Sequence, residues 1–145
     1  MELPEYITVN EVKRVCQTLG IRDWTALTEA KVLPKEAQSI LAEINLEGMP
    51  ITLERFCRGL EVELEHGIRF KDANVTNNHP ILTGKIVLAH FKETLDYYER
   101  LEVAELEGDL LKATLAGNAQ KVASLYKKLI AARLELSQAE SVELH

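Results

Sequence analysis

Apolar residues recur at intervals of three and four positions along nearly the whole chain, and no stretch of useful length alternates apolar with polar residues. The first pattern is typical of amphipathic α-helices, whereas strict alternation is typical of half-buried β-strands. We therefore expect an all-α protein that forms a compact helical bundle. The 145 residues suit one such bundle, because a chain of this length buries about two thirds of its unfolded surface.

Residues that start and stop helices divide this pattern. Thr8 and Glu11 have the spacing of a capping box, so a helix should begin after Thr8 and end at Gly20. Thr52 should cap a later helix that Gly67 ends in the left-handed conformation that suits glycine. Residues 68–79 then carry many Asp, Asn and Thr residues, which favour turns because short polar side chains bond the nearby backbone. We expect this loop to be ordered.

One further helical pattern runs without interruption from Pro80 to about Glu102 and should form a central helix. Beyond it, two short arms separated by Gly117 and Asn118 have the spacing of a coiled-coil seam. Each arm is short for a free coiled coil, so the hairpin must pack on the domain or on another copy of itself. We assign residues 1–102 to a helical core domain that carries the motifs described below, and residues 103–145 to a C-terminal amphipathic helical hairpin. The seam consists of Val103, Leu106, Leu110, Ala113, Val122, Leu125, Leu129, Ala132 and Leu136.

Composition excludes several classes of protein. Lys and Arg number 17 against 23 Asp and Glu, and none of the ranges 1–50, 51–102 and 103–145 carries a net positive charge, so we expect no nucleic-acid binding. The longest apolar-rich run is interrupted by Lys85, so we expect no membrane segment. Cys16 and Cys57 are too few for a disulfide framework and should be buried free thiols. These features favour a cytoplasmic protein of bacterial type.

Two histidines stand three residues from a glutamate on helical segments. Glu63 precedes His66 in one helix, and His90 precedes Glu93 in another. Residues three apart lie on the same side of a helix, and carboxylate and imidazole pairs at this spacing hold metal ions in some helical bundles. A divalent metal bound by Glu63, His66, His90 and Glu93 is therefore one hypothesis.

The other hypothesis for these residues is a buried polar network. A helical wheel centred on Ile86 places His90 and Tyr97 on the apolar face, where an imidazole needs a hydrogen-bond partner. Glu63 and other nearby polar residues could supply it. We also expect Asn74 and Thr76 to bond the backbone or the helix end near His66. The proposed network comprises Glu63, Glu65, His66, Asn74, Thr76, Lys85, His90, Glu93, Tyr97 and Tyr98.

The blocks that carry these residues resemble an uncharacterised bacterial family with a domain of unknown function. They read VELEHG at 62–67, NVT at 74–76, P-x-x-TGKI-x-LAH at 80–90 and DYY-x-R-L at 96–101, and the resemblance covers residues 8–102. It implies no established activity. Two positions depart from the family pattern. His79 stands where an Asp usually precedes the Pro, and Leu95 stands where a Pro often precedes the DYY block, which should leave the long helix unbroken. The motif residues are those of the network together with Gly67, Thr83, Gly84 and Asp96.

No complete catalytic constellation is visible, so we favour a small non-catalytic all-α module for protein association and expect no cofactor. Its partner should be a protein, with self-association through residues 103–145 as one option. The alternative function is a metal-binding or metal-dependent protein that uses the two Glu and His pairs.

Overall fold

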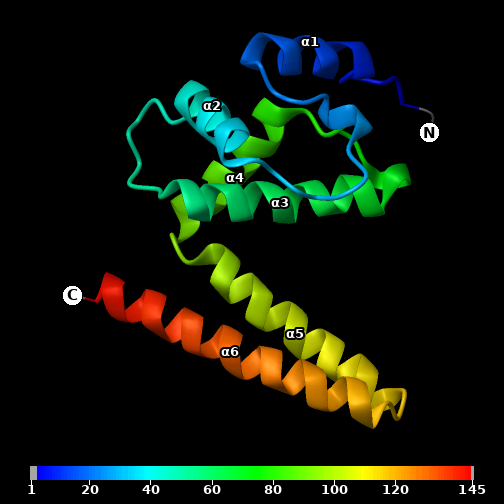
Figure 1. Cartoon of the computed structure of the whole chain (residues 1–145), viewed down its shortest axis with the longest axis vertical. Helices are drawn as coiled ribbons and strands as arrows, with labels where there is room; N and C mark the ends of the chain where they lie inside the picture. The colour runs from blue at the N-terminus through cyan, green and yellow to red at the C-terminus, as the bar shows by residue number, and fades with distance from the viewer. Residues whose placement is uncertain (1–2, 145) are drawn as a thin grey trace. The chain divides into compact units, whose positions relative to one another are not determined.

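The protein is described by a computed structural model over residues 3–144. These residues form six α-helices and two 3-10 helices and contain no strand, which confirms the all-α prediction (Figure 1). In chain order the elements are α1 (Val9–Leu19), η1 (Trp24–Ala26), α2 (Pro34–Ile44), α3 (Leu53–Arg69), η2 (Lys71–Ala73), α4 (Pro80–Glu93), α5 (Tyr97–Leu115) and α6 (Ala119–Glu143).

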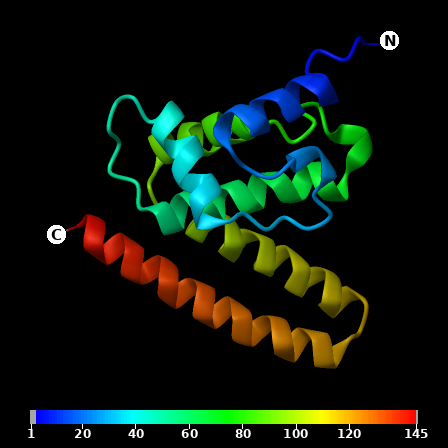
Figure 2. The same ribbon diagram turned by 45° about the horizontal axis from the view of Figure 1, so that its top comes forward.

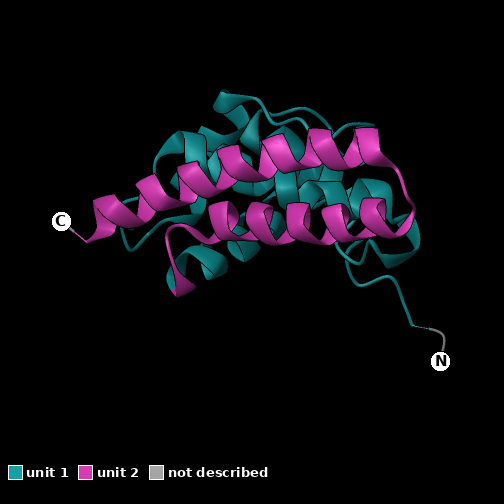
Figure 3. Cartoon of the chain, turned by 90° about the horizontal axis from the view of Figure 1, so that it is seen from below, with its two compact units in different colours: residues 1–92 teal, residues 93–145 magenta. Residues whose placement is uncertain are grey.

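The chain divides into two compact units, residues 1–92 and 93–145 (Figure 3). The first holds all elements from α1 to η2 and nearly all of α4, and the second holds α5 and α6. The boundary between the units falls at the last residue of α4, and α5 begins at Tyr97.

The helix starts follow the capping residues of the sequence. The hydroxyl oxygen of Thr8 accepts a hydrogen bond from the N–H of Glu11 at 3.2 Å, and that of Thr52 accepts one from the N–H of Arg55 at 3.3 Å. Each bond satisfies an amide that the first turn of a helix leaves without a partner. Gly20 ends α1 with φ of 66°, as expected for a glycine cap.

The core of the first unit is built from residues that repeat along one face of each helix. Trp24, Ile40, Phe56 and Leu60 are fully buried. Gly84 of α4 permits a close approach to α2, because a Cβ at this position would lie 2.8 Å from Cγ2 of Ile40. A larger residue here would force the Ile40 side chain to move, so packing and not backbone conformation favours glycine at this point of the core.

Gly67 does not end α3, so that prediction is wrong. The helix continues to Arg69, and Gly67 lies inside it without the positive φ of a left-handed cap. The physical reason is again packing, because side chains of the following loop lie against this glycine. This contact is described with the candidate site below.

The prediction of a single helix from Pro80 to Glu102 is also wrong. α4 ends at Glu93 and α5 begins at Tyr97. In the segment that joins them, the side chain of Asp96 is fully buried and accepts hydrogen bonds from Thr94 Oγ1 and from Nε and Nη2 of Arg100, the last two at 2.9 and 2.6 Å. Burial alone would raise the pKa of Asp96, but these bonds lower it below its ordinary value. These local hydrogen bonds stabilise the non-helical segment between α4 and α5, and Leu95 does not prolong the helix.

The second unit is the expected hairpin. α5 and α6 run side by side in opposite directions (Figure 2), joined at Gly117 with φ of 66° and Asn118, whose side-chain oxygen accepts from the N–H of Lys121 at 3.0 Å. Residues of the predicted seam face inward, with Leu129 at 2% and Ala132 at 5% exposure. The turn and the register of the seam are therefore confirmed.

Among residues 3–144, no helix combines the length and the apolar composition that crossing a membrane requires. Both cysteines are free. Cys16 is buried as expected, whereas Cys57 is only partly buried.

Candidate functional site

Glu63 of α3 lies between two histidines. Its Oε1 is 3.4 Å from Nε2 of His90 on α4, and its Oε2 is 3.8 Å from Nδ1 of His66, one turn further along α3. The side chain of Glu63 is 13% exposed and that of His90 25%, whereas His66 is 63% exposed. His90 therefore has the carboxylate neighbour that its position on the helical wheel required, and His66 lies at the solvent side of the same carboxylate.

Two asparagines fasten the loop after α3 to the end of that helix. Asn74 Nδ2 donates to the carbonyl oxygen of Gly67 at 3.3 Å and to Oδ1 of Asn78 at 3.0 Å. Asn78 Nδ2 in turn donates to the carbonyl oxygen of Trp24 at 3.3 Å. A Cβ on Gly67 would lie 2.2 Å from Oδ1 of Asn78, which is less than any real contact. We refer to Gly67, Asn74 and Asn78 as the asparagine lock.

Asn77 connects the same loop to the start of the chain. Its Nδ2 donates to the carbonyl oxygen of Ile7 and to Oε1 of Glu5, both at 2.6 Å. Asn77 and Asn78 have φ of 49° and 60°, a left-handed conformation that asparagine adopts more readily than most residues. Neither residue is among the site residues predicted from the sequence. The signal that could have identified them is the Asn-Asn pair shortly before Pro80, because asparagines in the left-handed conformation can form the turn that precedes a helix.

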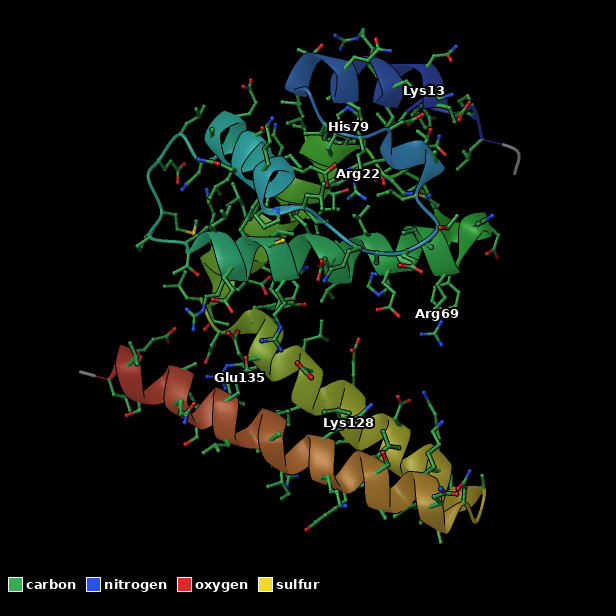
Figure 4. All side chains as sticks on the ribbon, viewed as in Figure 1. Lys13, Arg22, Arg69, His79, Lys128 and Glu135 are labelled. Carbon is green, nitrogen blue, oxygen red and sulfur yellow. The ribbon has the colours of Figure 1, made fainter. Side chains whose placement is uncertain are left out.

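His79 occupies the position just before α4, where Figure 4 labels it. It is 8% exposed, and its Nδ1 accepts a hydrogen bond from the N–H of Leu82 at 3.4 Å. Burial lowers the pKa of His79 below its ordinary value, although the carboxylate of Glu11 acts in the opposite direction. The neutral imidazole thus accepts a hydrogen bond from an N–H in the first turn of α4, as an acidic helix cap would, without placing a charge in the interior.

A small cavity of about 170 Å³ lies among the motif residues of the first unit. The asparagine lock forms one side of this cavity, and the hydroxyl of Thr83, which also lines it, donates to the carbonyl oxygen of His79 at 2.9 Å. Ligand pockets usually measure about 300 to 1,000 Å³. The cavity is therefore smaller than most ligand pockets. Its lining comprises Glu63, His66, Gly67, Ala73, Asn74, Val75, Thr76, Asn78, Thr83 and Ile86.

The other residues of the expected network lie apart from this cavity or outside the first unit. Glu65 and Lys85 are exposed, and Glu65 Oε1 is 3.7 Å from Nη1 of Arg69. The rings of Tyr97 and Tyr98 meet edge to face in the second unit, with centroids 5.2 Å apart. Glu93 also belongs to that unit. Within the first unit, the structure therefore brings Glu63 together with His66 and His90, and it places Glu63 and His66 with Asn74 and Thr76 around the cavity.

Within the described part of the chain, no three His, Cys, Asp or Glu side chains are grouped in a way that could hold a metal ion. Glu93, the fourth expected ligand, is exposed at the last position of α4. The metal hypothesis therefore receives no support from the geometry.

A second cavity, of about 670 Å³, lies between α3 and the segment that precedes α2. Val32, Leu33 and Leu53 form much of its apolar wall, with Lys31 and Glu61 among its charged residues. Cys57 also lines it, donates to the carbonyl oxygen of Val32 at 3.4 Å, and has its pKa raised by burial. This cavity was not predicted, because its walls come from segments that are far apart in sequence.

Comparison with family models matches residues 12–107 to DUF5661, described as a protein of unknown function. Comparison with curated proteins and comparison with solved structures gave no match.

Proposed function

The chain belongs to the DUF5661 family, and we propose that it is a small non-catalytic association module whose C-terminal hairpin pairs with a second copy of the chain. We propose that it acts in the cytoplasm, which the two free thiols favour because disulfides are rare there. The polar site around Glu63 has a structural role in this proposal and fixes the loop before α4.

The observation that carries the proposal is an exposed apolar stripe on α6. Tyr126, Ile130 and Leu134 follow one another at intervals of one helical turn, and they are 54%, 50% and 60% exposed. On α5, Leu111 is also 60% exposed and Leu115 79%. Soluble proteins rarely leave contiguous apolar side chains in water, and such patches mark surfaces that bind other proteins. We refer to Tyr126, Ile130 and Leu134 as the α6 stripe.

The α6 stripe lies outside the seam of the hairpin. Leu125, Leu129 and Ala132 fill the seam and are at most 7% exposed. The stripe is therefore not needed to pair α5 with α6, and a glutamate placed on it should not unfold the hairpin. This separation makes the association testable without destroying the fold.

Sedimentation velocity of the full chain tests the proposal. The unsubstituted protein should sediment as a dimer that dissociates on dilution, and Ile130→Glu should remain monomeric, because a buried unpaired charge opposes association. Ser124→Glu is the matched control, since Ser124 is exposed and lies about 120° around α6 from Ile130. A monomer at every concentration of the unsubstituted chain would contradict the proposal, as would equal effects of the two substitutions.

A further inference from the structure

The cavity of about 670 Å³ in the first unit has no role in the function proposed above. Its volume lies within the range of about 300 to 1,000 Å³ that is typical of small-molecule sites. Leu33, which lines it, is 45% exposed, and Pro34 and Glu54 at its edge are exposed as well. The cavity is therefore open to solvent, and a small molecule can reach it.

The loop that forms one wall of the cavity is fixed by hydrogen bonds. Every backbone N–H and C=O group of residues 31–33 has a partner within the first unit. Oε1 of Glu61 on α3 accepts from the N–H of Val32 at 3.0 Å, and Sγ of Cys57 donates to the carbonyl oxygen of Val32 at 3.4 Å. The wall is therefore preformed and offers no unbonded backbone group to a ligand. The other partners are Arg22, Glu29, Glu36 and Ala37.

The charges around the cavity balance one another. Its lining contains two cationic and two anionic side chains, Lys31, Arg58, Glu54 and Glu61. Nζ of Lys31 lies 3.4 Å from Oε1 of Glu61, which also accepts the N–H of Val32. Glu54 and Arg58 stand four residues apart on α3, a spacing at which opposite charges attract each other. An ionised ligand would therefore find no uncompensated charge of opposite sign here.

The side chains that face a ligand are mainly apolar. Val32, Leu33 and Leu53 form much of the wall. A polar group buried against them would lose its bonds to water without replacement, which weakens binding. An apolar cavity of about 150 Å³ holds one benzene molecule, so a single side chain of another protein would fill only part of this volume. We propose that the cavity binds an uncharged, largely apolar small molecule of roughly three aromatic rings.

Two fluorescent probes that share one skeleton test the class of ligand in the full chain. N-phenyl-1-naphthylamine is uncharged and consists of a phenyl and a naphthyl group, and 1-anilinonaphthalene-8-sulfonate adds a sulfonate to the same skeleton. The uncharged probe should bind saturably, with one molecule per chain and increased fluorescence. The sulfonate probe should bind on the order of tenfold more weakly, because the balanced charges leave its sulfonate without a partner.

Leu33→Ser tests whether the probe lies in this cavity. Leu33 caps the N-terminus of α2, a position that serine favours, so the helix should be kept while the cavity loses an apolar side chain. The Kd of the uncharged probe should rise on the order of fivefold. Leu46→Ser is the matched control and should leave the Kd unchanged, because Leu46 is 86% exposed and does not line the cavity. Ile130→Glu should also leave it unchanged, which separates this site from the α6 stripe and from the proposed function.

Alkylation by N-ethylmaleimide gives a second readout at Cys57, which lines the cavity and is partly buried. The uncharged probe should slow the reaction of Cys57, measured by mass spectrometry with the buried Cys16 as internal reference. Equal Kd values for Leu33→Ser and Leu46→Ser would overturn the inference, as would tighter binding of the sulfonate probe or an unslowed reaction at Cys57. Absence of saturable binding would also overturn it, whatever the oligomeric state of the chain.

Discussion

Replacing Gly67 by alanine should destabilise the protein, although the same change usually stabilises a helix. In an exposed helix, alanine is favoured over glycine by about 1 kcal/mol. At Gly67 the added Cβ would lie 2.2 Å from Oδ1 of Asn78 and 2.9 Å from Cγ of Asn74, so both side chains must move. Asn78 is 7% exposed, and a short buried side chain has little room to yield.

The movement breaks hydrogen bonds of the asparagine lock. The bond from Asn74 to Asn78 and the bond from Asn78 to the carbonyl of Trp24 depend on the present position of Asn78. A lost hydrogen bond costs about 0.5 to 1.5 kcal/mol, and a buried polar group left without a partner costs about 1 to 3 kcal/mol. After subtraction of the helix preference, the free energy of unfolding should fall by about 1 to 3 kcal/mol.

Urea unfolding followed by far-ultraviolet circular dichroism measures this change. Gly108→Ala is the matched control, because Gly108 also lies in a helix and its Cβ would meet nothing within 4 Å. That variant should gain up to about 1 kcal/mol. A second test is the pair Gly67→Ala with Asn78→Gly, in which Gly67→Ala should cost less because its closest contact is gone. If Gly67→Ala stabilises the chain as much as Gly108→Ala does, the account of the asparagine lock is refuted.

Three further predictions concern the same unit. His90→Ala should lower the free energy of unfolding by about 1 to 3 kcal/mol because Glu63 loses its neighbour, and an unchanged melting temperature would contradict this. Because the pKa of His79 is lowered in the folded chain, its contribution to stability is complete above the ordinary histidine pKa of about 6.5 and is lost as the pH falls toward the lowered pKa of the folded state. His79→Gln should therefore make the free energy of unfolding depend less on pH in that range. An unaltered pH profile would be evidence against the neutral cap. Asn74→Ala should speed proteolysis of the loop, whereas rapid amide exchange across residues 70–78 of the unsubstituted chain would show that the loop is not ordered.

Local signals predicted much of the fold. The caps at Thr8 and Thr52, the turn at Gly117 and the hairpin seam all depend on residues within a few positions of one another, and each is found in the structure. The break between α4 and α5 was missed because apolar periodicity continues through it. Only the buried Asp96, bonded to Arg100, distinguishes this point from a continuous helix.

The candidate site was predictable only in part. His90 and Glu63 could be paired because each lies near the buried side of its own helix, and the structure places them 3.4 Å apart. The bond from Asn74 to the carbonyl oxygen of Gly67 confirms the predicted contact with the helix end, whereas the bond from Asn78 to Trp24 could not be foreseen because it joins residues that are 54 positions apart. The same holds for Gly67, whose role depends on side chains that fold back onto it. Helical patterns do not reveal contacts of this kind.

The mass of the unsubstituted chain in solution tests the central claim most directly. Light scattering should give twice the 16.3 kDa of a single chain at high protein concentration, with the mass falling toward 16.3 kDa on dilution. A mass of one chain at every concentration would contradict association through the hairpin and leave the α6 stripe without the partner that we propose.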